Sequence, residues 1–265
     1  MADWVAKRIL ITVRTYPVPA RKGIEVSCTG GVTDDGKWIR LFPVPYRFLE
    51  EDKRFKKYQW IEVNVTKARN DQRPESFTPN LDTLKIGETI SSVDNWRARR
   101  EILRPLMRPS LCTIQRERDN CGSPTLGFFK PAQIVRLTIE DAEHANWTDE
   151  QMNILRQIPM FESAPADELE KIPFDFKYQF CCSDDSCSGH HLTCFDWEMG
   201  QAYRSWRRRY GDNWEQRFRN RFENEMINKN DTHLFVGNLH QFPTSWIIVG
   251  LFYPPLPATG DLFDR

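Results

Sequence analysis

Six cysteine and histidine side chains fall within fourteen consecutive residues, and this stretch constrains the fold more than any other part of the chain. Zinc prefers thiolate and imidazole ligands, and four of them usually close a structural site. A short loop that folds around one zinc ion would fix the angle between the segments on either side of it. The six side chains are Cys181, Cys182, Cys187, His190, His191 and Cys194.

Four of these residues have a spacing that suits one zinc ion in a single loop, and a closed set of four ligands predicts a structural role. Two alternatives remain open, because neighbours on a strand point to opposite faces. Cys181 could replace Cys182, and His191 could replace His190. A site with three protein ligands and a bound water also remains open. The predicted metal ligands are Cys182, Cys187, His190 and Cys194.

The composition fits a folded protein of one or two domains. Hydrophobic residues make up 40% of the 265 residues and aromatic residues 12%, which is enough to build a core. The 37 basic and 37 acidic side chains balance, which excludes a uniformly basic nucleic-acid coat protein but allows a locally basic face.

The cysteine usage and hydropathy predict a cytoplasmic protein with no membrane partner. Seven cysteines, most of them clustered, are typical of metal binding in a reducing compartment rather than of a disulfide framework. No apolar run reaches the roughly 18 residues that a membrane span needs. The N-terminal residues do not have the pattern of a signal peptide.

Alternation of apolar and polar residues predicts an α+β fold. The first 68 residues contain several short β-branched runs, which favour a β-rich meander or a partly open barrel. Near the C-terminus, Phe174–Phe180 predicts a strand that leads into the cysteine stretch. Helices are expected from Asp196 to about Tyr210 and from Trp214 to about Asn228, followed by two strands that complete a short sheet.

A change in composition after residue 145 suggests where the chain divides. The segment from 146 to 172 is acidic and proline-rich, and it is expected to be a linker or a surface excursion. We therefore predict a β-rich domain over 1–145 and a zinc-loop and helical α+β domain over 173–265.

The two predicted helices carry a dense group of arginines beside aromatic residues. Arginine neutralises phosphate with paired hydrogen bonds, and aromatic rings offer stacking surfaces for bases. The leading hypothesis is therefore a nucleic-acid-binding protein, with DNA and RNA both open, in which a structural zinc positions basic helices. The predicted contact residues are Arg204, Arg207, Arg208, Arg209, Arg217 and Arg221, with Arg97 and Arg100 as a second basic edge.

Two further hypotheses belong to other functional classes. A metal-dependent nuclease or hydrolase would require His191, Asp196 and His240 to converge on one open metal site. A protein-interaction module of a toxin–antitoxin or defence system would instead require a defined protein partner. The sequence has no phosphate-binding glycine loop and no nucleophile elbow, so no enzyme class is assigned.

Overall fold

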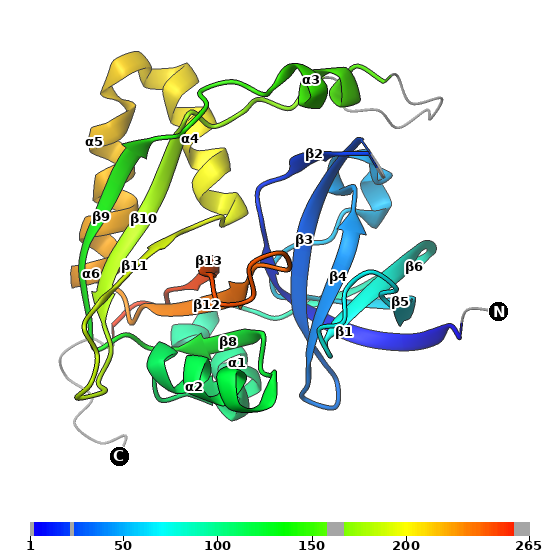
Figure 1. Cartoon of the computed structure of the whole chain (residues 1–265), viewed down its shortest axis with the longest axis horizontal. Helices are drawn as coiled ribbons and strands as arrows, with labels where there is room; N and C mark the ends of the chain where they lie inside the picture. Colours follow the sequence, from blue (N-terminus) through cyan, green and yellow to red (C-terminus); the bar gives the residue numbers. More distant parts are fainter. Residues whose placement is uncertain (1–2, 22–23, 158–166, 257–265) are drawn as a thin grey trace.

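A closed barrel occupies the N-terminal part of the chain (Figure 1). The structure is a computed structural model that describes residues 3–21, 24–157 and 167–256. The barrel strands follow the order β1-β5-β6-β4-β3, and β1 also pairs with β3, which closes the sheet. β4 and β6 run parallel, while the other pairs are antiparallel. The strands are β1 (Val5–Arg14), β3 (Ile24–Thr33), β4 (Trp38–Val44), β5 (Gln59–Lys67) and β6 (Ser76–Thr89), with β2 (Val18–Ala20) added alongside β3.

Alternating side chains explain why these strands form a barrel. Ile61, Val63 and Val65 of β5 are buried, whereas Glu62 between them is exposed. The hairpin between β3 and β4 turns at Gly36, whose φ of 75° is a left-handed conformation that glycine adopts without strain. The sequence favours a meander or a partly open barrel, but the pairing of β1 with β3 closes the barrel. Closure leaves its strands without free edges.

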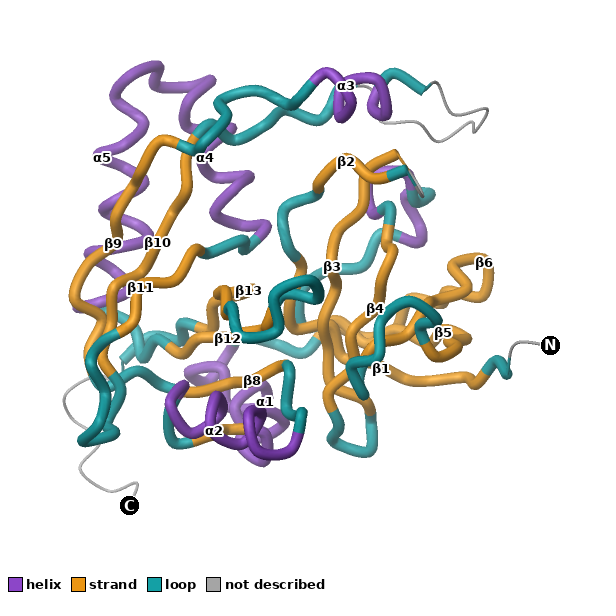
Figure 2. Tube along the Cα trace, in the orientation of Figure 1, coloured by secondary structure: helices purple, strands orange, loops and turns teal. Residues whose placement is uncertain are grey.

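The C-terminal part contains two sheets on the other side of the molecule, the first antiparallel and the second mixed (Figure 2). One sheet has the order β11-β10-β9, and the other has the order β13-β12-β8-β7. The strands are β7 (Met107–Arg108), β8 (Leu126–Phe129), β9 (Gln133–Asp141), β10 (Phe174–Cys181), β11 (His190–Thr193), β12 (His233–Asn238) and β13 (Trp246–Phe252).

Helices pack on these sheets, apart from α3, which contacts β2 and β3, and they complete the predicted α+β class. Phe218 of α5 stacks on Phe176 of β10 with ring centroids 4.3 Å apart, which places the helical layer against the three-stranded sheet. None of the described helices is long and apolar enough to cross a membrane. The helices are α1 (Val93–Leu103), α2 (Leu111–Cys121), α3 (Asp149–Leu155), α4 (Trp197–Tyr210), α5 (Trp214–Arg219) and α6 (Glu225–Asn228), with a π-helical turn at Asn220–Asn224 between the last two.

The barrel and the C-terminal part share a hydrophobic core where they meet. Val13 and Tyr58 of the barrel part pack in one buried cluster with Phe128, Phe235 and Phe252 of the C-terminal sheet. The division that the sequence suggests after residue 145 stays a prediction. Residues of β1 pack against apolar residues beyond position 125, so the barrel and the C-terminal part share buried surface.

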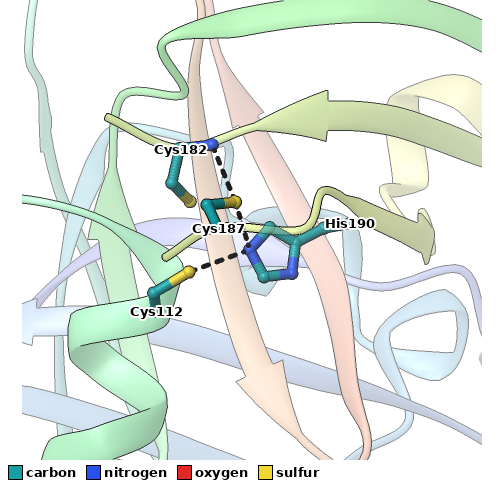
Figure 3. A group of neighbouring side chains, drawn as sticks. All are labelled: Cys112, Cys182, Cys187 and His190. Atoms are coloured by element: carbon teal, nitrogen blue, oxygen red, sulfur yellow. Dashed lines mark hydrogen bonds between the residues drawn. The ribbon is translucent and has the colours of Figure 1, made fainter. Parts of the chain in front are cut away.

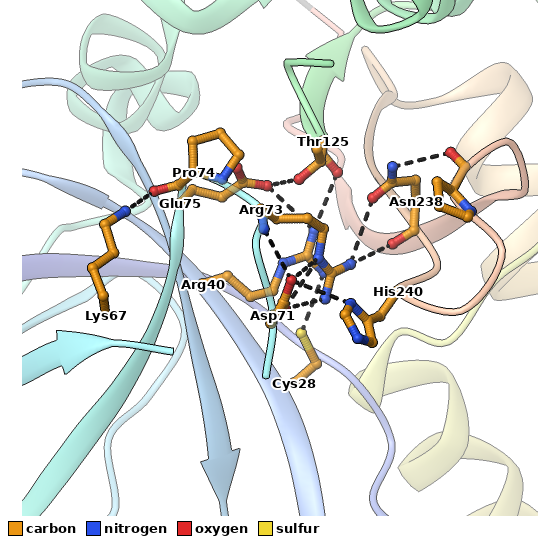
Figure 4. Close-up of polar contacts among 11 residues, drawn as sticks. Cys28, Arg40, Lys67, Asp71, Arg73, Pro74, Glu75, Thr125, Asn238 and His240 are labelled. Atoms are coloured by element: carbon orange, nitrogen blue, oxygen red, sulfur yellow. Dashed lines mark hydrogen bonds and ion pairs between the residues drawn. The ribbon is translucent and has the colours of Figure 1, made fainter. Parts of the chain in front are cut away.

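Polar contacts reinforce the same junction (Figure 4). The Arg40 guanidinium lies 3.5 Å from the Glu75 carboxylate, and both side chains are less than 10% exposed, at 5% and 7%. Arg40 also donates to the carbonyl of Thr125, and the Thr125 hydroxyl donates to Glu75. Nearby, Arg73 donates to the carbonyl of Asn238 at 2.7 Å. These bonds link the barrel to the starts and ends of C-terminal strands.

Candidate metal centre and basic surface

Three cysteines and one histidine gather at one end of the β10–β11 hairpin (Figure 3). We call Cys112, Cys182, Cys187 and His190 the Cys/His cluster; their ligand atoms all lie within 4.8 Å of one another. Nε2 of His190 is 3.3 Å from Sγ of Cys112 and 3.4 Å from Sγ of Cys187. Zinc-type bond lengths in a tetrahedron give ligand-to-ligand distances of about 3.5–3.8 Å. The cluster therefore needs only small movements to hold a metal ion.

The four ligands come from three consecutive elements and one distant helix. Cys182 follows β10, Cys187 lies in the turn of the hairpin, and His190 begins β11. Cys112 lies in the first turn of α2, whose N-terminus is capped by the Ser110 hydroxyl. A bound metal would therefore tie α2 to the hairpin.

The backbone of the loop is arranged to support a thiolate at Cys187. Its sulfur accepts hydrogen bonds from the amides of Cys182, at 3.3 Å, and Gly189, at 3.4 Å. Burial alone would raise the pKa of Cys187, but these backbone donors hold it below its usual value. Gly189 has a φ of 90°, a conformation that a larger residue would adopt only with strain.

The other members of the cluster have pKa values that a bound cation would change. Burial, together with the neighbouring Cys182 and Cys187, raises the pKa of Cys112 to about 12. Burial also lowers the pKa of His190, which favours the neutral imidazole that ligates metals. Three adjacent sulfurs can be thiolates together only beside a positive charge, so the donor set fits a metal ion.

An ion pair outside the cluster fixes the turn between its ligands. The Asp184 carboxylate lies 2.6 Å from the Arg116 guanidinium of α2 and accepts hydrogen bonds from the amide and hydroxyl of Ser186. Arg116, followed by Ser186, lowers the pKa of Asp184 to about 2. The same two elements that supply the ligands are thus joined a second time.

The structure brings three of the four predicted ligands together and replaces the fourth. Cys194 is not a member of the cluster. It is buried beyond the end of β11, its backbone forms an isolated β-bridge with Ile248, and burial raises the pKa of its thiol. Cys112 takes its place. Spacing could not identify Cys112, because it lies in a helix far upstream of the hairpin.

The three residues of the hydrolase hypothesis do not meet. His191 lies beside Thr138 and Glu140, on the exposed side of the three-stranded sheet. Asp196 is buried at the N-terminus of α4, and His240 lies 3.3 Å from Asp71 in the loop after β12. Among the described residues, the Cys/His cluster is the one group with ligand atoms close enough for a metal.

Most of the predicted phosphate-binding arginines form ion pairs within the chain. The buried Arg204 and the exposed Arg208 share Glu170, at 2.9 and 3.5 Å. Such pairs reduce what these side chains can offer to a ligand. The remaining pairs are Arg207 with Asp212, Arg221 with Glu225, Arg97 with Glu101 and Asp94, and Arg100 with Asp231.

Arg209 and Arg217 differ from this group. Both are exposed, and both place their guanidinium over the ring of Tyr210, at 5.3 and 4.3 Å from its centroid. Neither has a carboxylate partner among the residues that the structure describes. We call Arg207, Arg208, Arg209 and Arg217 the arginine surface; it occupies the end of α4 and the start of α5.

The fold and the cluster together define an α+β protein in which a closed barrel is joined to a sheet-and-helix part with a candidate metal centre. The chain belongs to the family described as "Domain of unknown function (DUF8757)", which matches residues 107–265. Residues 5–105, which include the barrel, match a second domain of unknown function, DUF8758.

Other comparisons add little to this assignment. No match was found among curated proteins. One similar solved structure is described as "Structure of murine DNA binding protein bound with ds DNA". The two sequences are 9% identical, and the match covers 98% of this chain and 99% of the other, with a TM-score of 0.32. A similarity this low carries no argument about function.

Proposed function

We propose that this chain is a nucleic-acid-binding protein in which the Cys/His cluster holds a structural zinc ion and the arginine surface binds phosphates. The observation that carries the proposal is the pair of exposed guanidiniums, Arg209 and Arg217, without carboxylate partners among the described residues and stacked on Tyr210. An arginine that is held by an aromatic ring loses little freedom when it binds a phosphate.

Zinc would serve this surface by fixing the sheet beneath it. Four protein ligands leave no open position, so the ion would not take part in chemistry. Its ligands anchor one end of the β10–β11 hairpin, and the helical layer packs on β9 and β10. Arg219 of α5 donates to the carbonyl of Leu137 in β9, and Glu223 accepts from the amide of that residue. The helices that carry the arginines are thereby held to the sheet that zinc would brace.

A salt series on wild-type protein and one double variant tests the proposal. Fluorescence anisotropy with labelled duplex DNA, single-stranded DNA and duplex RNA gives the dissociation constant at each salt concentration. Each phosphate contact steepens the logarithmic salt dependence by about one. We expect Arg209→Ala/Arg217→Ala to weaken binding and to reduce that slope by about two.

A second double variant controls for the loss of charge. Arg21 and Lys37 are exposed and lie on the barrel, so Arg21→Ala/Lys37→Ala removes the same charge from another face. We expect this variant to bind as the wild type does. Equal affinity of wild type and Arg209→Ala/Arg217→Ala for all three nucleic acids would overturn the assignment of this surface, and no salt-dependent binding by the wild type would overturn the proposed function.

A further inference from the structure

A second site lies between the barrel and the beginning of α4, away from the arginine surface. A cavity of about 160 Å³ is bordered there by Arg14 of β1, Lys57 before β5, and Trp197 at the start of α4. The arginine surface is at the opposite end of the same helix, which spans 14 residues and is therefore about 20 Å long. The two sites can thus be tested separately.

Two aromatic rings hold Arg14 at this cavity. Its guanidinium carbon is 3.6 Å from the ring centroid of Tyr46 and 4.2 Å from that of Trp197. Rings against the guanidinium leave mainly its edge, with the N–H groups, free to bond. Burial lowers the pKa of Arg14, and the neighbouring Tyr46 acts against this shift, but an arginine keeps its charge in a protein.

The N–H groups of Arg14 have few acceptors. One terminal nitrogen donates a long bond of 3.4 Å to the carbonyl of Phe55. Nε is buried and has no hydrogen-bond partner among the described residues. Buried donors in native proteins are nearly always bonded, and an unmade bond to a charged group is costly. Arg14 therefore has the bonding capacity for an acceptor that enters the cavity.

The two carboxylates at the cavity are already occupied. Asp196 accepts from the amides of Glu198, at 2.7 Å, and Leu251, at 3.0 Å, and from Lys57 at 3.3 Å. Glu198 accepts from the Tyr253 hydroxyl at 2.8 Å. These two acids thus offset the charge of Lys57 and satisfy backbone donors, whereas neither accepts a hydrogen bond from Arg14 in the structure.

The charges around the cavity leave a positive excess. Arg14, Lys56 and Lys57 face two carboxylates, Asp196 and Glu198, so three cations oppose two anions. The rest of the wall includes apolar side chains, Ile11, Val13 and Phe55 among them.

We propose that this cavity binds a small oxyanion, carried by inorganic phosphate or by a short organic carboxylate, through paired hydrogen bonds from Arg14. Planar guanidinium N–H groups match the oxygens of both anions. A volume of about 160 Å³ admits such a molecule but not a whole nucleotide. The site is independent of nucleic-acid binding.

Thermal shift and tryptophan fluorescence test this site with named probes. Inorganic phosphate, acetate and butyrate are titrated at constant ionic strength, with chloride as the control anion. Trp197 covers Arg14, so its emission should change on binding, and Trp197→Phe identifies its signal among the nine tryptophans. We expect a saturable response and a raised melting temperature with phosphate, with carboxylates, or with both; the responding probe names the source of the oxyanion.

Arg14→Lys keeps the charge but loses the planar pair of donors. We expect it to bind the responding anion at least tenfold more weakly, while Arg209→Ala/Arg217→Ala binds it as the wild type does. If Arg14→Lys unfolds, the wild-type titration still decides. Equal responses to chloride and to the oxyanions, or wild-type affinity in a folded Arg14→Lys, would overturn the proposal.

Discussion

Gly200 permits a close contact between α4 and the start of the barrel. A methyl group at this position would lie 2.4 Å from Cδ2 of Tyr16 and 2.9 Å from Cδ1 of Ile172. Replacing glycine by alanine inside a helix normally stabilises it by about 1 kcal/mol. Overpacking a buried site costs about 1–3 kcal/mol, so the two effects oppose each other.

We expect the packing cost to win, and Gly200→Ala to lower the free energy of unfolding by up to about 2 kcal/mol. Urea denaturation measures this value. Ser205→Ala is the matched control, because Ser205 lies on the exposed side of the same helix and gains propensity without a clash. A Gly200→Ala protein as stable as Ser205→Ala would show that Tyr16 and Ile172 move aside freely.

The Asp71 carboxylate makes a contribution to the stability of the fold that depends on pH. Arg73 donates to both carboxylate oxygens, at 2.9 and 2.6 Å. Burial would raise the pKa of Asp71, but the hydrogen bonds from Arg73 hold it well below the usual range. A carboxyl with a lowered folded pKa stabilises the fold above its unfolded pKa of about 4, and this contribution is lost as the pH falls toward the folded value.

Asp71→Asn should therefore destabilise the protein most at neutral pH. We expect a loss of about 1–3 kcal/mol at pH 7, as for other hydrogen bonds to charged groups, and a smaller difference from the wild type as the pH falls below about 4. Denaturation at a series of pH values measures the difference. A constant difference across this range would mean that the pKa of Asp71 is the same in the folded and unfolded chains.

At the scale of elements, the Cys/His cluster joins α2 to the β10–β11 hairpin. Cys112→Ser should lose the metal, whereas Cys194→Ser should keep it, because Cys194 lies outside the cluster. Metal analysis by mass spectrometry gives the content per chain. We expect Cys112→Ser to lose at least about 2.7 kcal/mol of stability, the linkage energy of a metal present at 100 times its Kd.

Cys121→Ser provides the control for this comparison, since Cys121 is an exposed cysteine of the same helix. It should match the wild type in metal content and melting temperature. Retention of metal by Cys112→Ser together with its loss from Cys194→Ser would favour the ligand set that the sequence spacing suggests.

Elements set by local patterns could be predicted, and those set by distant contacts could not. The alternation of Phe174–Phe180 matches β10, and the N-cap at Asp196 begins α4 as expected. The start of α1 follows no such local pattern: the φ of Asp94 is 55°, and the left-handed run continues through Trp96. Trp96 packs against Phe252, 5.2 Å away, a contact that the local sequence does not reveal.

On the scale of the whole molecule, a buried ion pair inside the barrel, between Arg40 and Glu75, is hydrogen-bonded to Thr125 of the C-terminal part. Removing one partner of such a pair leaves an uncompensated charge and costs about 3–5 kcal/mol. We expect this loss for Arg40→Met, whose partner Glu75 is 7% exposed. Arg40→Met/Glu75→Gln should lose less than the sum of the two single variants, as urea denaturation can measure.

An exposed pair provides the comparison. Arg97 and Glu101 are 73% and 56% exposed, so Arg97→Ala should change stability by about 0.5 kcal/mol or less. Equal effects of Arg40→Met and Arg97→Ala would contradict a structural role for the buried pair.

The sequence could indicate the α+β class and the barrel, because both depend on short-range periodicity. It could not indicate the ligand Cys112 or the Arg14 cavity, because each unites residues that are distant in sequence. The cavity needs β1 beside α4, and the isolated bridge between Thr15 and Asp196 is part of that contact. Neither partner has a local pattern that specifies the other.

The strand order has a consequence for how the nascent chain assembles. Every pairing of the barrel lies within residues 5–89, whereas β8 must wait for β12, which begins at His233. At about 5–20 residues per second, synthesis delivers β12 several seconds after β8. The four residues of β8 are all buried in the finished fold. During that interval only the two-residue strand β7 can pair with them. They are then an apolar segment that lacks its longer partner strand, and a chaperone that binds short apolar segments would find one there.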